Sequence, residues 1–171
     1  MKESLAEQLS HLTGKSLPEK EVKKKKKKKI FPQVKEENLV RGSVIYIPLS
    51  AEEGLIVTGG YKERNKYVTI IGTTADGFVI GSLLINTDPH DATPELGACQ
   101  FPLKLKDYPS ILDYDSWLDC SQLFRIAKKK VLSRGGFCGS IISSDWDLIL
   151  PFLRETEAIS NREKREFGII V

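Results

Sequence analysis

The sequence has few of the residues that most catalytic and metal sites use. It contains only two histidines, His11 and His90, and three cysteines, Cys99, Cys120 and Cys138, which form no C-x-x-C pair. Neither histidine has a partner at metal-ligand spacing, so we expect no zinc site and no histidine-based catalysis. The phosphate-binding motifs G-x-x-x-x-G-K-[ST] and G-x-G-x-x-G are missing as well. The sequence therefore predicts no metal, no cofactor and reduced cysteines that pack in the core.

Long apolar segments are also missing. No apolar run approaches the roughly 20 residues that a membrane-spanning helix needs. The first residues, Met-Lys-Glu-Ser-Leu, lack the apolar centre of a signal peptide. We expect a cytoplasmic protein that makes no contact with a membrane.

Positive charge is concentrated near the N-terminus, in a run of seven consecutive lysines. Residues 1–40 carry eleven Lys and six Glu, whereas residues 41–171 carry 15 basic and 17 acidic side chains. The second part is therefore slightly acidic, so the run alone supports an interaction with polyanions. A solvated spacer, an arm that binds nucleic acid and a signal for localisation or a partner are all compatible with it. The lysine run consists of Lys23, Lys24, Lys25, Lys26, Lys27, Lys28 and Lys29.

Two regions follow from these patterns. Residues 1–40 combine a short amphipathic helix over 3–13 with a lysine-rich flexible linker. Residues 41–171 form one domain, because their number is close to the commonest domain size. Within it, β-branched and aromatic residues predict strands at 43–49, 66–71, 78–85, 99–105 and 137–142, with one or two more at 116–126.

The turn and helix signals complete the fold. Asp76-Gly77 predicts a hairpin between the second and third strands. A helix is expected only at the end, with Ser144 as its N-cap and a kink or break at Pro151. Many short strands with one terminal helix, and no β-α-β alternation, predict a mainly β fold with a C-terminal helix, arranged as a small bent sheet or barrel.

Cationic and hydroxyl side chains lie near the predicted strand ends. Lys62, Arg64 and Lys66 precede or begin the second strand, and Thr87 follows the third. In a bent sheet, Arg64 or Lys66 could face Thr87 across one concave surface and bind a phosphate oxygen. RNA cleavage can proceed from such a pair, because the ribose 2′-OH supplies the nucleophile. A charged hairpin loop and a strand-end threonine without any function remain an alternative. The cluster of Asp113, Asp115 and Asp119 is typical of a solvated loop.

The order of motifs resembles the PemK/MazF family of toxin endoribonucleases over residues 41–160. Arg41-Gly-Ser-Val-Ile-Tyr-Ile-Pro-Leu49 resembles the family's opening R-G strand, and Gly77–Thr87 resembles the strand that ends in its P-[IVL]-[TS] motif. Asp115–Ile126, with Ser121-Gln-Leu123 in register, resembles a later segment of the family. The family's Arg-Pro pair is replaced here by Lys66-Tyr67, and Thr87 lacks the preceding proline.

The resemblance implies a small SH3-like β-barrel that cleaves single-stranded RNA without a metal and forms a homodimer. Arg64, Lys66 and Thr87 would then be catalytic, while Lys62 and the lysine run would bind RNA. An antitoxin protein would be a further partner. A catalytically inactive barrel that binds nucleic acid or protein stays open as an alternative, as does a scaffold whose N-terminal region docks a regulator.

Overall fold

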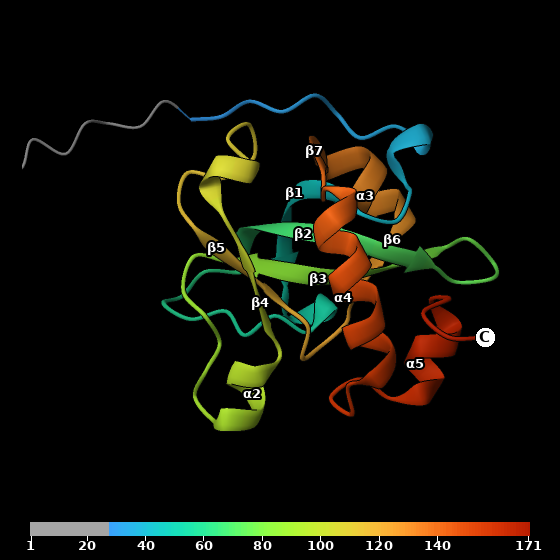
Figure 1. Cartoon of the computed structure of the whole chain (residues 1–171). Coiled ribbons are helices and arrows are strands. Elements are labelled where there is room, and N and C mark those ends of the chain that lie inside the picture. The colour runs from blue at the N-terminus through green and yellow to red at the C-terminus, as the bar shows by residue number, and fades with distance from the viewer. Residues whose placement is uncertain (1–27) are drawn as a thin grey trace, which may run out of the picture.

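A computed structural model describes residues 28–171, and they form a mainly β fold (Figure 1). One antiparallel sheet of seven strands has the order β4-β5-β3-β2-β1-β7, with β6 also paired to β3. The prediction of a mainly β class is confirmed. The sheet does not close into a barrel within the described residues, so the SH3-like barrel stays a prediction. The strands are β1 (Ser43–Ser50), β2 (Glu63–Thr73), β3 (Val79–Asn86), β4 (Gln100–Leu103), β5 (Ser116–Asp119), β6 (Phe124–Ala127) and β7 (Gly136–Ser140).

Four helices are described, of which the sequence predicted one. Helix α4 begins with Ile142 as its N-cap, two residues before the predicted Ser144, and continues through Pro151. Because Pro151 lies on the exposed side, the missing backbone donor costs no buried hydrogen bond and the predicted break does not occur. The helices are α2 (Pro94–Ala98), α3 (Lys128–Arg134), α4 (Ser143–Glu155) and α5 (Asn161–Glu166), and short 3-10 turns cover Glu36–Asn38, Ala51–Glu53 and Leu105–Asp107.

The long strands send alternate side chains to two separate cores. On one face of the sheet, residues such as Val44 and Leu83 pack with Ile149 and Leu153 of α4, which crosses in front of the sheet in Figure 1. On the other face, Ile47 belongs to a second core that includes Val131 of α3. We call these the α4 face and the α3 face. Since the side-chain period of a strand is two, the face of each polar residue follows from its register.

The segment before β1 is attached to the sheet. The backbone N–H of Phe137 donates to the carbonyl of Pro32 at 2.7 Å, and that of Val34 donates to Gly135 at 3.0 Å. The Lys29 ammonium donates hydrogen bonds to the backbone carbonyls of Ile111 and Leu112. The end of the lysine run therefore lies against the domain. The predicted helix over 3–13 and residues 23–27 of the run lie outside the described residues.

No helix in the described range 28–171 is long and apolar enough to cross a membrane.

Candidate functional site

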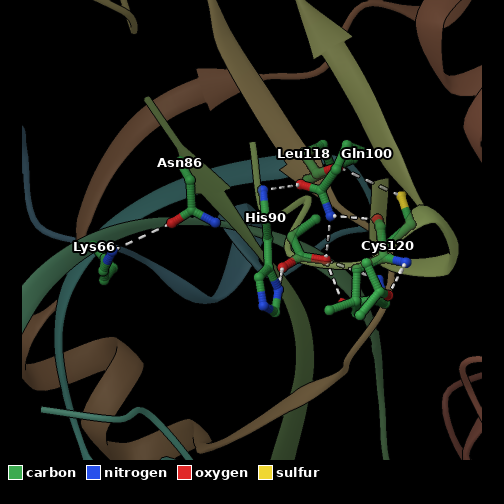
Figure 2. Close-up of polar contacts among 10 residues, drawn as sticks. Lys66, Asn86, His90, Gln100, Leu118 and Cys120 are labelled. Atoms are coloured by element: carbon green, nitrogen blue, oxygen red, sulfur yellow. Dashed lines mark hydrogen bonds and ion pairs between the residues drawn. The ribbon is translucent and has the colours of Figure 1, made fainter. Parts of the chain in front are cut away.

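Arg64 and Lys66 lie together at the start of β2. They pair with Leu49 and Ile47 of β1, both of which belong to the core of the α3 face. Both cations therefore point to the α3 face. The Lys66 ammonium donates to the side-chain oxygen of Asn86, the last residue of β3, at 3.2 Å (Figure 2). Arg64 is exposed, and no described residue offers its guanidinium a hydrogen bond or a carboxylate.

Within residues 28–171, no carboxylate forms an ion pair with Arg64 or Lys66. Lys66 is half-buried, and its pKa is lowered from the usual lysine value, first by burial and then by the charge of Arg64. Both effects disfavour the charged ammonium. An anion bound between the two side chains would relieve this repulsion, and phosphate oxygens accept strong charge-assisted hydrogen bonds. The start of β2 is therefore suited to binding a phosphate group.

Thr87 lies away from these cations. It borders a small cavity of about 110 Å³ on the α4 face, together with Tyr67, Ile85 and Ser116. Neighbouring residues of one strand point to opposite faces, and Thr87 follows Asn86 directly. The structure therefore does not bring Thr87 next to Arg64 or Lys66 on one concave surface. Their catalytic roles stay predictions.

Lys62 lies just before β2 and is exposed. It borders a shallow hollow with Glu52, Glu63 and Lys130. The other two cations of this hollow have acidic partners: Lys130 contacts Glu53 at 2.6 Å, and Arg134 contacts Glu63 at 2.5 Å. The Lys62 ammonium is thus open to solvent, and nothing in the described structure holds it in a fixed geometry.

His90 and Asp119 form a hydrogen-bonded pair that the sequence analysis did not predict. The Asp119 side chain is only 7% exposed, and one of its oxygens lies 3.1 Å from Nδ1 of His90. The other oxygen accepts hydrogen bonds from Gln100 Nε2 at 3.0 Å and from the backbone N–H and hydroxyl of Ser121. The imidazole is therefore held by a buried carboxylate while half of the His90 side chain, 52%, stays exposed.

The same register places these groups on one face. Asn86 pairs with Trp117 of β5, and Gln100 of β4 pairs with Asp119. Alternation along β5 puts Trp117 and Asp119 on the side of Lys66 and Asn86. We call the set formed by Arg64, Lys66, Asn86, His90 and Asp119 the polar stripe.

The predicted acidic cluster is divided among separate partners. Asp113 contacts the Lys29 ammonium at 3.1 Å, Asp115 contacts Lys104 at 3.2 Å, and Asp119 holds His90. In the part of the chain that the structure describes, no group of three or more His, Cys, Asp and Glu side chains could hold a metal ion. The three acids therefore stabilise loops rather than one ion site.

Neither known protein families nor curated proteins give a match to this chain. The resemblance to the PemK/MazF family consequently rests on the sequence motifs alone.

Proposed function

We propose that this protein is a metal-independent endoribonuclease that cleaves single-stranded RNA, similar to PemK/MazF toxins and built on a variant of the SH3-like barrel. The observation that carries the proposal is the unneutralised pair of Arg64 and Lys66. The cations lie beside Asn86 at the ends of β2 and β3, on the same face as His90. Cations for a phosphate and an exposed imidazole for a proton are the groups that RNA cleavage needs.

The reaction uses the RNA's own nucleophile. The ribose 2′-oxygen attacks the neighbouring phosphorus, the bond to the 5′-oxygen breaks, and the products are a 2′,3′-cyclic phosphate and a 5′-hydroxyl. Arg64 and Lys66 stabilise the negative charge that grows on the phosphoryl oxygens. His90, oriented by Asp119 through Nδ1, accepts at Nε2 the proton that leaves the 2′-hydroxyl and passes it to the departing 5′-oxygen. A homodimer and an antitoxin partner belong to this proposal as predictions.

A second candidate is a catalytically inactive module that binds nucleic acid or protein. It is favoured by the position of Thr87, which borders a cavity on the α4 face, opposite to Lys66. The slightly acidic balance of residues 41–171 favours it as well. In that case the polar stripe and the lysine run would bind RNA without breaking it.

Cleavage of a mixed single-stranded RNA in EDTA, with mapping of the new 5′ ends, tests the proposal. We expect site-selective products that carry a 5′-hydroxyl. The Arg64→Ala/Lys66→Ala double variant and His90→Gln should each lower the rate at least a hundredfold, because each removes charge stabilisation or proton transfer. Thr87→Ala tests whether Thr87 has the catalytic role that the family resemblance implies. Lys106→Ala, which removes an exposed lysine outside the polar stripe, is the matched control and should leave the rate unchanged.

Three outcomes contradict the enzyme. Intact RNA at high protein concentration would leave the binding module as the function. Cleavage that all the variants retain would place the activity elsewhere or in a contaminant. Cleavage that EDTA abolishes would exclude the metal-independent mechanism.

A further inference from the structure

A hollow of about 600 Å³ lies on the surface beside the starts of β2 and β7. It is bordered by Lys28, Phe31, Tyr46, Asn65, Arg134 and Gly136, among others. No residue of the polar stripe lines this hollow, yet the two are neighbours along β2. Arg64 and Lys66 belong to the stripe, whereas Asn65 between them borders the hollow. Because alternate side chains of a strand point to opposite faces, the hollow lies on the face of β2 opposite to Arg64 and Lys66.

The rings of Phe31 and Tyr46 border this hollow, and the ring of Tyr67 packs against both of them. The ring centroids of Tyr46 and Tyr67 are 4.8 Å apart, and Phe31 lies 5.8 Å from Tyr46 and 6.0 Å from Tyr67. All three side chains are half-buried, so part of each ring contacts solvent. Burial, followed by nearby Cys138 and Asp113, raises the pKa of Tyr67 to about 12, which keeps its phenol neutral at physiological pH. We call the hollow with these rings the aromatic hollow.

The position of Phe31 is fixed by the backbone around it. Gln33 pairs with Gly136, and Phe137 donates its N–H to Pro32. Gly136 permits this approach, since a Cβ atom there would lie 2.8 Å from the Cβ of Phe31. On the other side, the ammonium of Lys29 reaches Asp113. The rings are therefore held in a defined arrangement before any ligand binds.

The cations near the rings differ in whether an acidic residue pairs with them. Arg134 is paired with Glu63, and Lys29 is paired with Asp113. Lys28 is exposed, and no described side chain pairs with its ammonium. It also continues the lysine run in sequence. Aromatic faces next to unpaired cations are the combination that proteins use to bind single strands, with bases stacked on the rings and phosphates near the cations.

We propose that the aromatic hollow binds unpaired bases of single-stranded RNA, with Phe31 and Tyr46 as stacking surfaces and Lys28 as a phosphate contact. The choice of RNA as the occupant rests on the proposed function. This contact is separate from Arg64 and Lys66, which point to the opposite face of β2. A base-paired duplex cannot stack on the rings, because its bases are already stacked. The hollow therefore selects for single strands.

Binding can be measured without cleavage, using the full chain and a labelled single-stranded 12-mer with 2′-deoxy sugars, which lacks the nucleophile. Phe31→Leu and Tyr46→Leu should each weaken binding at least tenfold, because leucine fills space but offers no flat ring. Tyr46→Phe keeps the ring and should bind within twofold of the natural protein. Phe78→Leu removes an exposed ring in the β2–β3 turn and is the matched control. Circular dichroism melts confirm that each variant is folded.

Each outcome decides the proposal. Unchanged binding by Phe31→Leu and Tyr46→Leu, equal affinity for the matching duplex, or no binding by the natural protein would overturn it. Capture of a peptide in the hollow in place of the 12-mer would do the same. The nuclease proposal can fail while the binding proposal holds. Binding that depends on the rings, together with RNA that stays intact, would support RNA binding in the hollow and reject the enzyme. Cleavage that persists in both ring variants would retain the enzyme and reject the hollow.

Discussion

At the scale of single residues, a buried hydroxyl in the sheet lacks a partner. Thr69 of β2 is fully buried, and within residues 28–171 nothing accepts or donates a hydrogen bond to its Oγ1. Burying such a group without a partner costs free energy, so we expect Thr69→Val to raise the free energy of unfolding by about 1 kcal/mol. Urea unfolding monitored by tryptophan fluorescence measures the change.

Thr74 supplies the matched control for this prediction. Its hydroxyl donates to Asp76 at 2.6 Å and accepts from the N–H of Val79 at 3.1 Å, at the β2–β3 turn. The same chemical change, Thr74→Val, should therefore lower the free energy of unfolding by about 1 kcal/mol. If both valine variants were destabilised alike, the hydroxyl of Thr69 would have to be satisfied in solution.

At the scale of elements, the C-terminal residues fit against the sheet through glycine. A Cβ on Gly72 of β2 would lie 2.2 Å from the carbonyl oxygen of Phe167, which follows α5, and a Cβ on Gly81 of β3 would lie 2.5 Å from the Phe167 ring. We expect Gly72→Ala to lower the free energy of unfolding by about 2–3 kcal/mol, because a backbone oxygen cannot move aside. Thermal and urea unfolding give the value.

Gly97 in α2 is the control for that prediction. A Cβ there meets Asp91 at 3.4 Å, an ordinary contact, so Gly97→Ala should be neutral or slightly stabilising. In Gly81→Ala the new Cβ meets only the Phe167 side chain. Adding Phe167→Leu should therefore restore part of the lost free energy of unfolding. A Gly72→Ala protein as stable as Gly97→Ala would show that α5 does not pack as described.

The elements also explain what the sequence could predict. β1, β2 and β3 and their Asp76-Gly77 turn were predicted, because β-branched runs and turn residues are local signals. α3 was missed since only Val131 is buried among its seven residues and no apolar period is visible. Over 116–126 the sequence predicted one or two strands. The structure has two, β5 and β6, and both pair with β3, a pairing that is set by distant contacts.

The candidate site was harder to predict for the same reason. Arg64 and Lys66 were selected from their place before a strand, and the structure keeps them adjacent. The contact between His90 and Asp119 joins residues 29 positions apart, and no local pattern announces it. Thr87 is only one residue beyond Asn86, which contacts Lys66. That single position puts the Thr87 side chain on the opposite face of the sheet.

At the scale of the whole molecule, charge and shape are divided between two regions of the chain. The net positive charge lies in residues 1–40, whereas the polar stripe and the aromatic rings of Tyr46 and Tyr67 belong to a slightly acidic part. Contacts between lysines and phosphates give an affinity that is independent of the RNA sequence. Rings that stack on bases, and cations held in place, fix the position of the RNA on the protein. In the proposed nuclease, affinity for RNA and the position of cleavage should therefore respond to different substitutions.

Replacing lysines 23–27 by glutamine in the full chain tests this division. Each phosphate contact to a single strand contributes about 0.7 to the slope of log affinity against log salt, so loss of five contacts should reduce the slope by about 3.5. Titrations of the labelled 12-mer at several salt concentrations measure it. The sites of cleavage should stay the same, because Arg64, Lys66 and the aromatic hollow are untouched. An unchanged slope would mean that the lysine run is a spacer, and altered cleavage sites would mean that it selects the RNA.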